Sequence, residues 1–110
     1  MSLDEIPDRI FVSLGRRGFD PVNPKQCPKC ELFGPGGLKL LEKKLYEEVK
    51  SEEGIKRVID YKIRCLQCNT IFYIRLQHII QKIDGEEKRI TTLVNILDEK
   101  QNDLGWVGNF

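Results

Sequence analysis

Two stretches near the middle of the chain have residue patterns typical of β-strands. In residues 55–64, charged residues separate Ile59, Tyr61 and Ile63, which matches the two-residue period of a half-buried strand. Residues 70–76 are rich in β-branched and aromatic side chains, the types that are enriched in strands. Both stretches are therefore predicted to be strands.

The pattern of residues 38–49 fits two structures. As a helix, this stretch would gather Leu38, Leu41, Leu45 and Val49 on one face. Its many Glu and Lys residues also favour a helix locally. As a strand, it would turn at residues 51–54 and pair antiparallel with residues 55–64. The hairpin is the prediction, because it returns the chain directly to its starting point, as the cysteine pattern described below requires.

The pattern changes again after residue 77. Ile90, Leu93, Val94 and Leu97 follow one another at helical spacing. Acidic residues near the start of this segment and Lys100 near its end suit the helix dipole. We therefore predict a helix over residues 87–101. A second hairpin that turns at Asp84 and Gly85 is the alternative, because the residues from 90 to 92 are β-branched.

The size of the chain makes a stabilising metal plausible. At 110 residues, it can form one small domain whose core leaves little margin of stability without a metal or a disulfide. Its 18 basic and 17 acidic residues nearly cancel. Net charge therefore indicates no class of partner, and a nucleic-acid surface would have to be a local patch.

The sequence contains no apolar run of membrane-spanning length and no signal-peptide core at its start. We therefore expect a cytoplasmic protein in a reducing compartment, with no membrane partner and no small-molecule substrate. The sequence makes no prediction about its oligomeric state.

The four cysteines form two couples, each with two residues between its sulfurs. This spacing lets a short turn aim both thiolates at one ion, and two such turns supply the closed tetrahedral set that suits Zn²⁺. The gap between the couples is long, but lengthening a flexible loop costs little beside the roughly 10–16 kcal/mol that structural zinc contributes. We predict one structural Zn²⁺, with the ligands Cys27, Cys30, Cys65 and Cys68.

Three other uses of the cysteines remain open at this point. Two disulfides would suit an extracellular chain, and a redox dithiol needs only one couple. An iron–sulfur cluster could use the same four ligands.

The residues before the first couple, 1–26, are predicted to form an arm. Residues 10–14 are a short apolar run that favours a strand, and the glycines and prolines that follow exclude a helix. Arg16 and Arg17 could contact phosphate or an acidic partner, since guanidinium groups suit both. They could equally lie in a solvated turn.

The predicted order is first cysteine couple, strand, turn, strand, second cysteine couple and strand. This order and the two cysteine couples resemble the zinc-ribbon family over about residues 26–76. The resemblance implies a nucleic-acid setting, because many zinc ribbons belong to transcription, ribosomal or replication proteins. We therefore expect a small metal-stabilised α+β fold: a zinc ribbon with an antiparallel three-stranded sheet plus a C-terminal helix. The arm would be followed by a ribbon core over residues 27–76 and by a helical extension and tail over residues 77–110, packed on the ribbon.

Catalysis is not expected from this sequence. Four thiolates would leave no open position on the metal for water. His78, the single histidine, has apolar neighbours in the sequence and is more typical of a packing residue. The glycine-rich residues 34–37 lack the lysine and the spacing of a phosphate-binding loop.

A basic face is predicted on the sheet. Lys62 and Arg64 share one side of their strand, and Tyr73 and Arg75 have the same relation on the next strand. Such a face can hold a nucleic-acid single strand, because cations follow the phosphates and a ring stacks on a base. The same residue types also occur on ordinary solvated strands.

The sequence therefore predicts a zinc-ribbon nucleic-acid-binding protein in transcription or its regulation, with single strands favoured over duplexes. The alternative is a protein-interaction adaptor that docks on a larger, transcription-type complex through its arm, its helix or the Trp106 tail, without touching nucleic acid. Only the first should lose affinity steeply with salt. The predicted nucleic-acid-binding residues are Lys62, Arg64, Tyr73, Arg75, Arg16 and Arg17.

Overall fold

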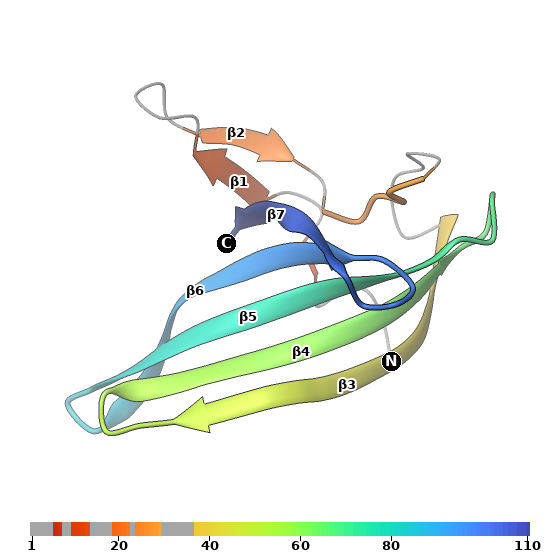
Figure 1. The fold of residues 1–110 in the computed structure, drawn as a ribbon. Helices are drawn as coiled ribbons and strands as arrows, with labels where there is room; N and C mark the ends of the chain where they lie inside the picture. The colour runs from red at the N-terminus through yellow and green to blue at the C-terminus, as the bar shows by residue number, and fades with distance from the viewer. Residues whose placement is uncertain (1–5, 8–9, 14–18, 23, 30–36) are drawn as a thin grey trace.

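The described part of the chain forms one antiparallel sheet of seven strands, in the order β2-β1-β7-β6-β5-β4-β3 (Figure 1). The structure is a computed structural model. Side chains are described throughout except in residues 11–13 and 19–22, for which the backbone alone is described. The described residues are 6–7, 10–13, 19–22, 24–29 and 37–110.

Five consecutive strands form a meander in which each strand pairs antiparallel with the one before it. Two short strands near the N-terminus extend the sheet, because β1 pairs with β7 at Phe11 and Asn109 and β2 pairs with β1. Figure 1 shows β3 to β6 as long, gently curved ribbons that lie side by side. The strands are β1 (Ile10–Ser13), β2 (Phe19–Val22), β3 (Leu38–Lys50), β4 (Gly54–Cys65), β5 (Ile71–Ile83), β6 (Glu86–Leu97) and β7 (Asp103–Asn109).

The ambiguous residues 38–49 lie in β3, and their predicted pairing with β4 is confirmed. The turn between the two strands is closed by Ser51, whose backbone N–H donates to the Gly54 carbonyl over 2.8 Å. Bulges interrupt the ladder between Leu40 and Glu42 and between Leu45 and Glu47. Tertiary pairing thus overrides the local helix preference of the Glu and Lys residues.

The predicted α+β fold is wrong, as are its three-stranded sheet and its helix over residues 87–101. Those residues instead form β6 and the turn that leads into β7, and no α-helix occurs in the described part of the chain. Asp84 and Gly85 have φ angles of 52° and 81°. Two consecutive positive values are typical of a type I′ turn, which matches the twist of flanking strands. The chain therefore forms the second hairpin that the sequence offered as an alternative.

No helix among the described residues is long and apolar enough to span a membrane.

The two sides of the sheet differ in chemistry. Tyr61, Ile63, Phe72, Ile74 and Leu76 are buried on one side, which we call the core face, because the register sets Tyr61 opposite Ile74 and Ile63 opposite Phe72. The other side, the polar face, carries Lys62, Tyr73 and Arg75.

The N-terminal segment belongs to the same hydrophobic core. Ile6 and Ile10 are fully buried and lie in one cluster with the core face of the sheet. Cys27 and Cys65 belong to this cluster too. The cysteine cluster described below is therefore built into the core and is not a separate surface feature.

Gly54→Ala tests the pairing of β4 with β5. A Cβ at this position would overlap the carbonyl oxygen of Ile80 on the neighbouring strand, and backbone atoms cannot give way as the end of a side chain can. We expect a loss of about 1–3 kcal/mol in the free energy of unfolding, measured by urea denaturation.

The matched control is Glu53→Ala, one residue earlier at an exposed position. It should change the stability by no more than about 0.5 kcal/mol. Equal stabilities of the two variants would contradict the close approach of Gly54 to β5.

Candidate functional site

Three of the four cysteines come together at the end of β4. The sulfur atoms of Cys27, Cys65 and Cys68 all lie within 4.8 Å of one another, and those of Cys27 and Cys68 are 3.6 Å apart. Tetrahedral coordination with metal–sulfur bonds of about 2.3 Å separates neighbouring sulfurs by about 3.8 Å. A disulfide would require about 2.05 Å. The three sulfurs are therefore close enough to hold a metal ion.

The second cysteine couple lies in a tight turn between β4 and β5. The backbone N–H of Cys65 donates to the Thr70 carbonyl, and that of Asn69 donates to the Cys65 carbonyl, both over 2.8 Å. Asn69 has a φ angle of 61°, the left-handed conformation that Asn tolerates better than most residues. These bonds fix the backbone of the turn that carries Cys65 and Cys68.

A hydroxyl group accompanies the cysteine cluster. Thr70 Oγ1 lies 3.0 Å from Cys68 Sγ. Because a thiolate can only accept, Thr70 donates this hydrogen bond when the cysteine is deprotonated. Hydrogen bonds of this kind orient metal ligands and tune their basicity.

The first couple is only partly described. Cys27 is fully buried, whereas Cys30 lies outside the described residues. The chain that follows this couple returns beside the second turn, because the Leu66 N–H donates to the Gly37 carbonyl over 2.9 Å. A metal at this point would join the N-terminal segment to the β4–β5 turn from within the core. The burial of Cys27 and Cys65 excludes water from that side.

The predicted basic face is the polar face of the sheet. The register sets Lys62 opposite Tyr73, Asp60 opposite Arg75 and Arg64 opposite Ile71. Residues two apart on a strand share a face. Lys62, Arg64, Tyr73 and Arg75 therefore project from the same side.

Arg75 is held by two partners on this face. Its Nε donates to Asp60 Oδ1 over 2.7 Å and its Nη2 donates to Oδ2 over 3.0 Å. Asp60 is only 3% exposed, and its hydrogen bonds raise the pKa of Arg75 above the ordinary value. The ring of Tyr46 stacks on the guanidinium with 4.2 Å between Arg75 Cζ and the ring centroid. Arg75 therefore fixes other groups and is not free to follow phosphates.

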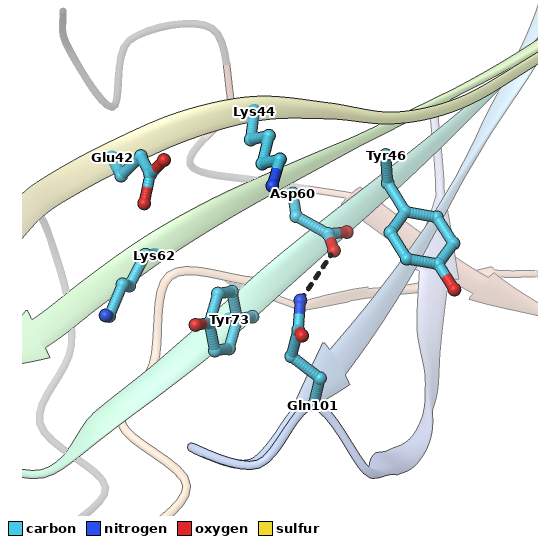
Figure 2. Close-up of a pocket in the computed structure, with 7 residues that line it drawn as sticks. All are labelled: Glu42, Lys44, Tyr46, Asp60, Lys62, Tyr73 and Gln101. Carbon is cyan, nitrogen blue, oxygen red and sulfur yellow. Dashed lines mark hydrogen bonds between the residues drawn. The ribbon is translucent and has the colours of Figure 1, made fainter.

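A pocket of about 360 Å³ opens on the polar face (Figure 2). Two tyrosine rings, two lysines and two carboxylates line it, and Gln101 reaches over from the turn before β7 to donate to Asp60 over 3.4 Å. Figure 2 shows these side chains arriving from β3, β4, β5 and that turn. The lining residues are Glu42, Lys44, Tyr46, Asp60, Lys62, Tyr73 and Gln101.

Sequence reasoning missed the contribution of β3 to this pocket. Tyr46 lies at the bulge between Leu45 and Glu47, and simple alternation cannot assign a face to a residue at a bulge. The available signal was Asp60, an acidic residue that lies two residues before Lys62 on the same side of β4. An acidic residue there needs a cationic partner on a neighbouring strand.

Of the other residues singled out in the sequence, those that the structure describes do not line the pocket. Arg64 keeps a buried Nε with no hydrogen-bond partner among the described residues. His78 Nδ1 lies 2.6 Å from Thr92 Oγ1 on the core side, far along the sheet from the cysteines. Arg16 and Arg17 lie outside the described residues. Trp106 is about half exposed, and its pairing with Asn95 puts it on the polar face.

No protein-family model matches the chain, and neither a curated protein nor a solved structure matches it. The chemistry of the site must therefore be argued from the cysteine cluster and from the polar face.

Thr70→Val tests the hydrogen bond to Cys68. The change keeps the shape of the side chain and removes the hydroxyl that donates to the sulfur. We expect the affinity for Co²⁺, followed by its thiolate absorption, to fall about 10–100-fold.

Gln67→Ala is the control, because Gln67 is exposed in the same turn and should leave the affinity unchanged. An unaltered Co²⁺ affinity in Thr70→Val would show that the hydroxyl plays no part in metal binding.

Proposed function

We propose that the protein is a zinc-stabilised binder of single-stranded nucleic acid. The observation that carries this proposal is the pocket on the polar face, where Lys44 and Lys62 lie beside the rings of Tyr46 and Tyr73. Cations that meet phosphates and flat rings that meet bases are the two elements by which proteins hold single strands.

The zinc completes the fold in this proposal. Cys30 supplies the fourth thiolate to the set formed by Cys27, Cys65 and Cys68, whose sulfurs already lie at distances suited to one ion. Thiolate ligands in tetrahedral number favour zinc over harder cations. Such a closed site is structural, and it agrees with the resemblance of the cysteine couples to zinc ribbons. A place in transcription stays a prediction of that resemblance.

Affinity would come from the local face rather than from the whole chain. The net charge is +1, so general attraction to a polyanion is weak. Stacking of a base on an aromatic side chain contributes roughly 1–3 kcal/mol. Tyr46 is held in position by Arg75, so its ring is ordered before a ligand arrives. We therefore expect modest affinity that depends on salt.

A docking role for the C-terminal strand is favoured by a different observation. Leu104 and Trp106 are each about half exposed on β7, and an exposed tryptophan is a common anchor at protein interfaces. This supports the adaptor alternative, in which β7 binds a protein partner. Binding that survives high salt would favour it.

Zinc content tests the metal part of the proposal. We expect one zinc per chain, measured by atomic emission, and a large fall in the midpoint of thermal unfolding when a chelator removes it. Cys30→Ser should weaken zinc binding by about a hundredfold or more. The loss of a direct ligand should reduce the affinity by more than the roughly 10–100-fold that the loss of an outer-shell partner usually costs. Iron in place of zinc, or unchanged melting after chelation, would contradict this part.

Nucleic-acid binding tests the face directly. Lys62→Glu should weaken binding of a fluorescent single-stranded oligonucleotide about tenfold and reduce the salt slope by roughly one phosphate contact. Tyr73→Leu keeps an apolar side chain but removes the flat ring, and should cost roughly 1–3 kcal/mol of binding free energy. Fluorescence anisotropy at several salt concentrations measures both effects.

Lys88→Glu is the control, since it makes the same charge change at an exposed position near the β5–β6 turn. It should bind nearly as the parent does. Equal losses in Lys62→Glu and Lys88→Glu would show that only overall charge matters. No binding even at low salt would reject the nucleic-acid function.

A further inference from the structure

The outer edge of β3 is the longest open edge of the sheet. β3 is the last strand in the sheet order and spans Leu38–Lys50. On its outer side no strand of the described chain pairs with it, so backbone N–H and C=O groups along that side lack a ladder partner. Such an edge is a template for pairing with another strand.

This edge also exposes large apolar side chains. Leu45 is 53% exposed, Tyr46 is 57% exposed and Val49 is 50% exposed. Natural edge strands usually carry few apolar groups and many charges, which discourage pairing. β3 carries exposed apolar side chains as well as many charges, so the arrangement of its charges decides which partner it can accept.

The charges on the two sides of Leu45 and Tyr46 in β3 have opposite signs. Two lysines, Lys43 and Lys44, precede Leu45 and Tyr46, and two glutamates, Glu47 and Glu48, follow them. In an antiparallel pair of two such strands, Lys44 would lie opposite Glu47 of the second copy and Lys43 opposite its Glu48. Each ion pair would occur twice because of the two-fold symmetry. Opposite charges across an antiparallel pair stabilise it.

Lys44 and Glu47 lie on the same face of the sheet only because of the bulge between Leu45 and Glu47. Lys44 pairs with Asp60 and Glu47 pairs with Val58. Positions 58 and 60 share the polar face of β4, so Lys44 and Glu47 share that face too.

The outer pair of charges, Lys43 and Glu48, also shares one face, which is the core face. Lys43 pairs with Tyr61 and Glu48 pairs with Arg57, and both of these β4 residues lie on the core face. In a regular strand, residues three or five apart point to opposite sides. The extra residue of the bulge restores the match, so each lysine meets a glutamate on its own face.

Registers shifted by two residues in either direction bring like charges together. A slip of two residues in one direction sets Glu42 opposite Glu47, which both lie on the polar face. A slip in the other direction sets Lys43 opposite Lys50 on the core face. Like charges directly opposite each other destabilise an antiparallel pair. The charge pattern thus selects one register and rejects those beside it.

We propose that β3 pairs antiparallel with β3 of a second copy of this chain, with Lys44 opposite Glu47, so that two sheets join into one. The two-fold axis would run through the sheet, between Leu45 and Tyr46. Both polar faces would then lie on the same side of the joined sheet. The two pockets, each lined by Lys44 and Tyr46 of its own β3, would flank the junction.

A charge-exchange experiment tests this pairing. Lys44→Glu sets glutamate opposite glutamate, and Glu47→Lys sets lysine opposite lysine, at both symmetric positions. Each variant alone should dimerise roughly 10–100-fold more weakly than the parent. An equimolar mixture of the two should form a heterodimer, because every repulsive pair then becomes an attractive one. Sedimentation velocity of the zinc-loaded full chain, without nucleic acid, measures all three samples.

The double variant Lys44→Glu with Glu47→Lys is the matched control, since it exchanges the two charges within one chain and should dimerise as the parent does. Melting curves show that each variant is folded. A monomeric parent at high concentration overturns the proposal. So do variants that dimerise as well as the parent, or a mixture that fails to restore association. Failure of nucleic-acid binding has no bearing on these outcomes, because none of them depends on it.

Discussion

The convergence of three sulfurs at the end of β4 is the constraint on which the rest of the structure depends. Cys27 comes from the N-terminal segment, whereas Cys65 and Cys68 come from the β4–β5 turn. Cys27 and Cys65 lie in one cluster with the core face of the sheet, so the cysteines and the hydrophobic core stabilise the same contact. In a chain of this size, burial of apolar surface alone leaves little margin of stability. The contact between these distant segments therefore does much to determine the fold.

That constraint is also why part of the fold could be predicted. Local preference favoured a helix over residues 38–49, but the cysteine couples had to meet, and a hairpin is the direct way to bring them together. β3 and β4 form that hairpin. The turn after Cys65 could be anticipated for the same reason, since Asn69 adopts the left-handed conformation that a tight turn needs. A long-range chemical requirement can therefore be read from the sequence even where local propensity points elsewhere.

Where no such requirement existed, prediction failed. β6 carries Ile90, Leu93, Val94 and Leu97 at helical spacing, and its last four residues, 94–97, are all buried, without alternation. The strand is buried on both faces there, so the two-residue period disappears and a strand cannot be told from a helix by pattern. The Asp84-Gly85 pair was the better signal, because this residue pair favours the type I′ turn of a hairpin. Both residues have positive φ angles in the structure. The ion pair of Asp60 and Arg75 escaped prediction for a related reason: alternation gives a residue's face but not its opposite partner.

The bulge of β3 between Leu45 and Glu47 links the two surfaces of functional interest. In a regular strand of the same residues, alternation would continue unbroken and Lys44 and Glu47 would point to opposite sides of the sheet. With the bulge, Tyr46 stacks on Arg75 over the polar face, and the charges on both sides of the midpoint come into phase. Bulges usually protect an edge strand by twisting it away from partners. Here the same irregularity places an aromatic ring in the pocket and puts Lys44 and Glu47 of the open edge on one face, so the pocket and the charge pattern of the edge depend on one bulge.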